Sequence, residues 1–137
     1  MAWDEGQGQI TDLSFKAAAD LSALQYTFVK LDANGNLIAA AAAGEKCVGV
    51  LQNKPKLGET ATVRPVGTSK VVASAAIAAG DYVATTAAGQ AKTALRLVQA
   101  SGNASNVMGM AMRAAAGAGV IITCDIQRTG IWPTADV

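Results

Sequence analysis

The sequence predicts a mainly β fold, a small barrel or sandwich of short antiparallel strands with an extended N-terminal arm. Three observations support this prediction. Short runs of apolar and β-branched residues recur along the chain, glycine-containing turns separate them, and some of the runs appear twice. Short strands with turn signals about every eight to twelve residues are typical of all-β sandwiches and barrels.

Composition limits the size of the core. The 137 residues favour one domain, and 51% of them are hydrophobic, but only 4% are aromatic and much of the apolar content is alanine. Small side chains remove little surface from water, so we expect a thin core that gains part of its stability from a neighbouring subunit. We divide the chain into an arm (1–15), a β domain (16–128) and an irregular tail (129–137).

The arm is polar and contains glycine, so it buries too little surface to order itself. Trp3 is an exception, because a large aromatic side chain in such a segment can anchor it to a partner. An equally open alternative is that Trp3 folds back onto its own domain. The candidate contact residues, with capsid or subunit as the target, are Trp3, Asp4, Ile10, Leu13, Phe15 and Trp132.

The first elements follow from local patterns. Residues 16–25 have helical propensity but are short, so a turn of helix and a loop both stay open. Residues 26–31 alternate as a strand does. Asn34-Gly35 is a strong hairpin signal, and it predicts a return strand over 37–43.

The next predicted strands are 47–52 and 60–66, joined by a turn that contains proline and glycine. Pro65 lacks a backbone donor and therefore predicts a sheet edge or bulge. A further strand is expected around 70–74.

The last third of the chain repeats the hairpin pattern, with Ala88-Gly89 at the turn. The remaining predicted strands are 95–99, 106–112 and 119–126, the last of which is the most continuous apolar run.

An internal repeat connects the two halves. Residues 28–37 align with 82–91, 54 positions later, and Val48–Val50 align with Met108–Met110, 60 positions later. The alignment indicates two related β-modules of about 45 residues each.

The residues offer little for catalysis. The chain contains no histidine, which removes the commonest general base and a common metal ligand. Ser69 and Lys70 are adjacent on a predicted strand and would point to opposite faces. The acidic residues show no metal-loop spacing, and no glycine motif matches a nucleotide-binding loop. We expect no enzyme activity, no cofactor and no metal.

Charge argues against a nucleic-acid partner. Eleven basic and ten acidic residues give a net charge of +1, and the basic residues are scattered, whereas phosphate binding needs them clustered. Lys54, Lys56 and Arg64 surround one predicted hairpin, where a solvated turn is the simpler interpretation and an anion site the alternative.

The sequence context of the cysteine and methionine residues is typical of side chains in a hydrophobic core. Cys47 and Cys124 each lie in an apolar run and are expected to be buried thiols, with a disulfide between them as the alternative. Met108, Met110 and Met112 alternate with period two, which places them on one strand face, either in the core or on an adaptable contact surface.

The opening residues lack the basic and apolar regions of a secretory signal, and alanine-rich stretches such as 37–44 are too short to span a bilayer. We therefore expect no membrane partner and a chain made in the cytoplasm or assembled there into something larger.

From Tyr26 to Ile126 the sequence resembles the small capsid decoration (cement) proteins of tailed bacteriophages. The family's pattern is a "GV" strand, a proline- and glycine-containing hairpin, a "GD" turn and a final "G-x-A" strand. The positions that carry it here are Gly49, Val50, Pro55, Gly58, Glu59, Val63, Gly67, Gly80, Asp81, Gly89, Gly109, Met110, Ala111, Gly117 and Val120.

This resemblance implies a structural virion protein on the capsid exterior, often a homo-oligomer such as a trimer or dimer, which bridges major capsid protein subunits. The arm, the 101–105 loop and the tail lie outside the pattern. The alternative is another virion β-protein, either the base of a head fibre or a host-glycan-binding adhesin.

Overall fold

The computed structural model describes residues 12–94 and 105–131, which form ten β-strands and no helix. The strands are β1 (Leu13–Lys16), β2 (Phe28–Leu31), β3 (Leu37–Ala39), β4 (Gly49–Leu51), β5 (Thr60–Arg64), β6 (Gly67–Val72), β7 (Tyr82–Thr85), β8 (Ala91–Thr93), β9 (Asn106–Ala111) and β10 (Ile121–Ile131). The predicted β fold is confirmed.

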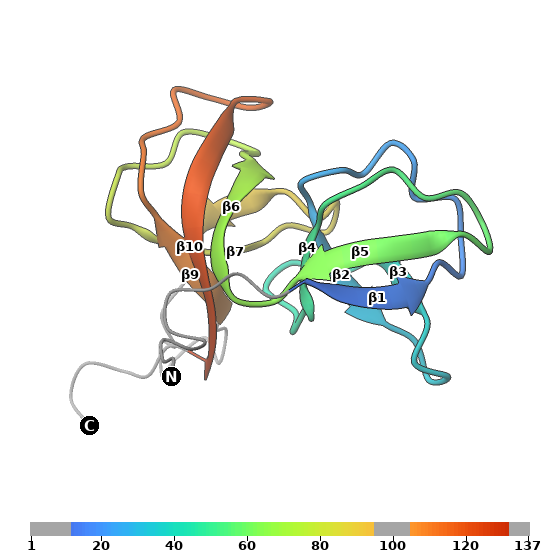
Figure 1. The fold of residues 1–137 in the computed structure, drawn as a ribbon. Coiled ribbons are helices and arrows are strands. Elements are labelled where there is room, and N and C mark those ends of the chain that lie inside the picture. The colour runs from blue at the N-terminus through green and yellow to red at the C-terminus, as the bar shows by residue number, and fades with distance from the viewer. Residues whose placement is uncertain (1–11, 95–104, 132–137) are drawn as a thin grey trace, which may run out of the picture.

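The strands form two open five-stranded antiparallel sheets, and neither closes into a barrel. The first has the order β1-β5-β4-β2-β3 and the second has the order β6-β10-β9-β7-β8. Figure 1 shows them beside each other, joined by the short connection from β5 to β6. Each strand of one sheet has a counterpart at the same place in the other, so the chain consists of two related modules. We call them the first module (β1–β5) and the second module (β6–β10).

The repeat extends to the pairing register. Val29 in β2 is opposite Gly49 in β4, and Val83 in β7 is opposite Gly109 in β9. Beyond the first strand of each module, Ala17 bridges to Leu37 and Ala73 bridges to Ala91, both in parallel. The internal repeat predicted from the sequence is therefore a repeat of topology and of register.

Each module packs the same sheet face against its own loops. In the first module the cluster consists of Ala17, Leu21, Val29, Leu37, Leu51, Ala61 and Val63. The residues at the matching positions of the second module, all within one larger cluster, are Ala73, Ile77, Val83, Ala91, Ala111, Ile122 and Cys124.

The larger cluster also contains side chains from the first module. Phe28 and Val50 project from the opposite face of the first sheet and are completely buried among the core residues of the second module. Burying one such side chain contributes about 1.5–3 kcal/mol, so this contact joins the modules into one hydrophobic core.

The two predicted hairpins are confirmed. Gly35 in the β2–β3 turn and Gly89 in the β7–β8 turn have φ values of 80° and 82°, a region in which a residue with a side chain is strained. In the first hairpin the carboxylate of Asp32 also accepts hydrogen bonds from the backbone N–H groups of Asn34 and Asn36.

Other elements differ from the sequence expectations in extent. Of the two alternatives left open for residues 16–25, the structure has the loop: after Ala17 the chain forms turns, because backbone N–H groups such as that of Leu21 bond to the β4–β5 loop instead of within a helix. β3 ends at Ala39, and the chain then turns so that the N–H of Gly44 bonds to Thr85 of the second module. β10 continues to Ile131, within the segment expected to be irregular, because it pairs with β9 beyond a bulge.

One glycine in each module permits close packing of strands. A Cβ atom on Gly49 would lie 2.5 Å from the carbonyl oxygen of Arg64, and one on Gly109 would lie even nearer to that of Asp125. Both are below 3.0 Å, a separation that real Cβ atoms essentially never show. The obstacle is backbone in each case, so it cannot rotate away.

We therefore expect Gly109→Ala to lower the free energy of unfolding by about 1–3 kcal/mol, the usual cost of overpacking. The matched control is Gly117→Ala, where a Cβ would meet nothing within 4 Å. Urea denaturation of both variants measures the difference. Equal stabilities of the two variants would contradict the close strand approach.

The two cysteines are free and buried, as expected from the sequence. Burial raises the pKa of the Cys47 thiol to about 12 and that of Cys124 to about 11. The thiolate is the reactive form, so at pH 8 on the order of 1 in 1,000 or fewer of these groups would react even if a reagent reached them.

In the native protein at pH 8 we expect almost no labelling by an aromatic disulfide reagent over the time in which a free thiol reacts fully. In denaturant the same protein should release two equivalents of chromophore, one for each of the two cysteines. Rapid labelling without denaturant would show that the core around these thiols opens easily.

Candidate functional site

The described residues hold no cluster of three or more His, Cys, Asp or Glu side chains that could bind a metal ion. Within the same residues, no helix is long and apolar enough to cross a membrane. Polar side chains from separate strands gather instead where the two modules meet. This junction and the exposed faces beside it form the candidate functional region.

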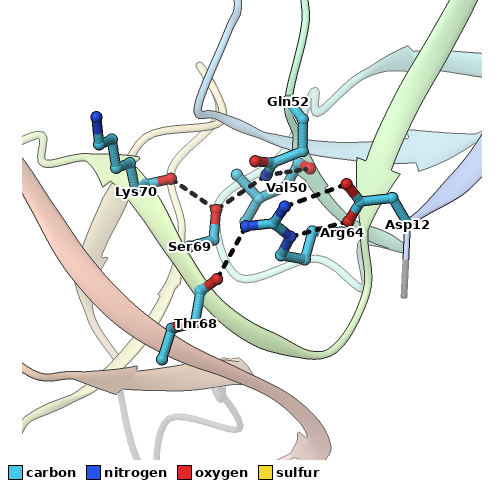
Figure 2. Close-up of polar contacts among 7 residues, drawn as sticks. All are labelled: Asp12, Val50, Gln52, Arg64, Thr68, Ser69 and Lys70. Carbon is cyan, nitrogen blue, oxygen red and sulfur yellow. Dashed lines mark hydrogen bonds and ion pairs between the residues drawn. The ribbon is translucent and has the colours of Figure 1, made fainter. Parts of the chain in front are cut away.

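Arg64, at the end of β5, links three parts of the chain (Figure 2). Its Nε and Nη2 donate to the two carboxylate oxygens of Asp12, at 2.8 and 3.1 Å, and its Nη1 donates to the carbonyl oxygen of Thr68 in β6, at 3.1 Å. The planar guanidinium can make all three bonds at once because its donors point in fixed directions. Arg64 thus holds the residue before β1 and the start of the second module together.

A second polar contact lies beside the first. The Nε2 of Gln52 donates to the buried Oγ of Ser69, at 2.9 Å, and also to the carbonyl oxygen of Val50. Ser69 Oγ in turn donates to the carbonyl oxygen of Lys70. Figure 2 shows these groups arranged next to Arg64 between the two sheets. Each buried hydroxyl or amide has a partner, as stable interiors require.

Backbone hydrogen bonds complete the junction. The N–H of Phe28 donates to the carbonyl oxygen of Gly89 at 2.7 Å, and the N–H of Val72 donates to that of Tyr26 at 2.9 Å. A Cβ on Gly89 would lie 2.8 Å from the carbonyl oxygen of Phe28, so only glycine allows the β7–β8 turn to approach β2 this closely. The second module therefore contacts the start of β2 through two backbone hydrogen bonds, one from the β7–β8 turn and one from β6.

Tyr26 adopts an uncommon backbone conformation at this junction. Its φ is 66°, and its counterpart in the second module is Gly80, with a φ of 91°. The two residues make matching hydrogen bonds, from Tyr26 to Leu51 and from Gly80 to Ala111. A residue with a side chain pays about 1–2 kcal/mol for such a φ. The ring of Tyr26 lies 5.8 Å from the ammonium of Lys70, a cation–π contact between the modules.

The basic residues around the opening hairpin do not converge. Lys54 and Lys56 are exposed in the β4–β5 turn, whereas Arg64 lies at the other end of β5. The turn is closed by Glu59, whose carboxylate accepts from the backbone N–H of Lys56. The lysines are thus part of a solvated turn, in agreement with the simpler interpretation.

The predicted contact residues are only partly described. Trp3, Asp4, Ile10 and Trp132 lie outside the described residues, and their roles stay predictions. Leu13 and Phe15 are in β1, the edge strand of the first sheet, on the same face two residues apart. Leu13 is 40% exposed, and Phe15 is half-buried against the core of the first module.

The methionine series divides between core and surface. Met108 is buried in the shared core, whereas Met110 is half-buried and Met112 is 54% exposed. The expectation of one common face is therefore wrong for Met108. Opposite this part of β9 the pairing with β10 shifts between Ile126 and Gly130, and such a bulge reorients the strand.

The sequence analysis did not single out Tyr82 as a surface residue. It is 40% exposed, and it pairs with Met110 across β7 and β9. The alignment of 28–37 with 82–91 contained the signal, because it matches Tyr82 to Phe28. Only the structure shows that Phe28 is buried whereas Tyr82 is partly exposed.

Replacing Arg64 by lysine should weaken the junction while keeping the charge, because one ammonium cannot serve both carboxylate oxygens and the carbonyl together. We expect Arg64→Lys to lower the free energy of unfolding by about 1 kcal/mol, since the pair is partly exposed. Arg113→Lys, at an exposed position, is the control. If both variants unfold at the same denaturant concentration, Arg64 does not stabilise the junction.

No family model and no curated protein sequence matches this chain. Among solved structures, the chain is similar to the head fiber gp8.5 N base in bacteriophage phi29, with a TM-score of 0.65 and 21% sequence identity. The match covers 89% of this chain and 98% of that chain. At this level of identity, the likeness shows that the two chains share a fold over nearly their whole length.

Proposed function

We propose that this protein is a structural component of a bacteriophage virion, which binds the outer surface of the capsid and stabilises the shell by bridging major capsid protein subunits. The observation that carries the proposal is the fold match to the base of a phage head fiber, which spans nearly all of both chains. The sequence resemblance to capsid decoration proteins supports the same role from separate residues.

The protein would stabilise the shell because its binding is thermodynamically linked to the closed state of the capsid. A protein that binds only the closed shell stabilises it, because opening the shell must also break each bridging contact. Residues 1–15, with Trp3 as the anchor, are proposed to contact the capsid. Trp132 is proposed to pack at a contact between copies of a homo-oligomer, a trimer or dimer. This role requires neither a cofactor nor catalysis.

The base of a head fibre is a second candidate, and the same fold match favours it. The two candidates predict different particles. A decoration protein forms compact density on the shell, whereas a fibre base carries a projecting shaft. A host-glycan-binding adhesin is a weaker alternative, because sugar binding relies on exposed aromatic rings and only 4% of this sequence is aromatic.

We expect the full-length chain to co-purify with intact capsids in a fixed ratio to the major capsid protein, and to raise the temperature at which those capsids open. Electron cryomicroscopy of the particles would place it on the shell or at a fibre. If the chain is absent from purified capsids, the proposed function is wrong.

The arm can be tested separately. Deleting residues 1–11 should reduce capsid occupancy, and Trp3→Ala should reduce it more than Trp3→Phe if the aromatic side chain is the anchor. The deletion leaves Asp12 and its pairing with Arg64 in place, so the melting temperature of the free protein serves as the folding control. Unchanged occupancy after the deletion would refute the anchoring role.

A further inference from the structure

β1 is an edge strand, and within the described chain no strand pairs with its outer side. The first sheet has the order β1-β5-β4-β2-β3, so β1 pairs with β5 alone. Three of its four residues are exposed, and Phe15 is half-buried. An edge strand presents unpaired backbone N–H and C=O groups, which can pair with a strand of another chain. β1 is therefore a candidate interaction surface.

The hydrogen bonds beside β1 identify which of its backbone groups point outward. Two residues beyond the strand, Ala18 donates its N–H to the carbonyl oxygen of Leu37, on the side away from β5. Backbone groups alternate between the two sides along a strand. The backbone groups of Asp12, Ser14 and Lys16 therefore point to the same outer side as those of Ala18. The bond from Ala18 also marks the end of the open edge.

The internal repeat shows how the equivalent edge is covered in the second module. β6 is the counterpart of β1, because each pairs with the last strand of its module in the same register. On the outer side of β6, Val72 donates its N–H to the first module, and the carbonyl oxygen of Thr68 accepts from Arg64. The corresponding residues of β1 and its flank are Lys16 and Asp12. Within the described residues, no bond of this kind covers their backbone groups.

A second copy of β1 matches this edge in antiparallel orientation. Pairing centred on Ser14 engages every outward-facing residue of both strands and places Asp12 of one copy opposite Lys16 of the other. Opposite charges at such paired positions stabilise a sheet. Leu13, which is 40% exposed, lies opposite Phe15 and gains an apolar neighbour. A register centred on Lys16 would instead set two ammonium groups face to face. The edge is therefore complementary to itself.

The position of the second module favours the same orientation. Arg64 pairs with Val50, Val50 pairs with Phe28, and this row of residues meets the second module. Asp12 extends the row through its ion pair with Arg64. The second module thus lies at the Asp12 end of β1, where Figure 1 shows the connection from β5 to β6. An antiparallel copy carries its second module at the opposite end, whereas a parallel copy would place both at the same end.

We propose that two copies of this chain form a dimer through β1, with the two strands antiparallel and the two-fold axis at Ser14. The main chains exchange hydrogen bonds at Ser14 and between Asp12 and Lys16, so the two first sheets become one continuous sheet. The contact is isologous, because both copies use the same surface. The inference does not depend on the proposed virion role, since it concerns the purified chain alone. It leaves residues 1–11 of the arm for the capsid.

The first test is the molar mass of the full-length protein, measured by sedimentation velocity across a concentration series up to about 1 mM. A contact along one short edge strand is smaller than a standard interface of about 1,600 Å². We therefore expect a weak, reversible dimer and no larger species. A wild-type chain that stays monomeric over this range overturns the proposal, and the edge would then be open to a different protein.

The variant Ser14→Pro separates the intermolecular bonds from the fold. Proline removes the outward N–H, whereas the ladder with β5 uses the backbone groups of Leu13 and Phe15, so an edge strand tolerates proline here. We expect association at least about tenfold weaker than in the wild type, with little change in the melting temperature of the monomer. Ser14→Ala keeps the N–H and should associate as the wild type does. Equal association of the two variants contradicts the proposal.

The variant Lys16→Glu tests the pairing of charges. It places a carboxylate opposite Asp12 of the second copy, so association should weaken several-fold, and more at low salt than at high salt. The matched control is Arg113→Glu, which changes the net charge by the same amount at an exposed position of the second module. If both variants weaken association equally, net charge is responsible and the proposed register is wrong.

A covalent cross-link tests the two-fold axis directly. Opposed residues of a hydrogen-bonded pair have Cα atoms about 5.5 Å apart, which is within the range of a disulfide. The two native cysteines are buried, so Ser14→Cys adds an exposed thiol that can be oxidised selectively. Under mild oxidation we expect a covalent dimer on a non-reducing gel, formed much faster than with the control Arg113→Cys. Equal rates for the two variants would overturn the proposed axis.

Discussion

The burial of Phe28 and Val50 inside the second module is the interaction on which the rest of this structure depends. A five-stranded open sheet has two faces, and in each module one of them packs against the module's own loops. The other face of the first sheet carries apolar side chains that would otherwise lie in water. That face packs against the second module, so the two sheets share one continuous hydrophobic core. This packing removes apolar surface from water although the sequence has very few aromatic residues.

The polar groups at the junction serve the same packing. Arg64 bonds to Thr68 and Gln52 bonds to Ser69, so hydrogen bonds between the modules border the apolar contact, and Asp12 holds the guanidinium of Arg64 from within the first module. Such bonds are directional, and hydrophobic contact is not. The apolar contact supplies most of the free energy, whereas the polar rim fixes how the modules are oriented. The strained φ of Tyr26 persists because its backbone N–H and carbonyl groups are both held in this arrangement.

Duplication of the module explains the surface of the molecule as well as its core. Equivalent positions have the same pairing register in both modules but different surroundings, because Phe28 and Val50 are buried in the shared core, whereas Tyr82 and Met110 line a surface depression. Phe28 is buried and Tyr82 is exposed for this reason, although both begin the same hairpin.

The sequence by itself determined the local features. Turn residues such as Asn34-Gly35 and Gly89 specify the hairpins because their backbone conformations are set within a few residues, and alternating apolar residues set the strands. Alignment of the halves predicted two modules, and the apolar context of the cysteines predicted their burial. Only the tertiary structure decided that the sheets are open, that Met108 is buried whereas Met112 is exposed, and that Arg64 meets Asp12. These features arise between residues far apart in the chain, where contact depends on how two sheets pack and not on the pattern along either of them.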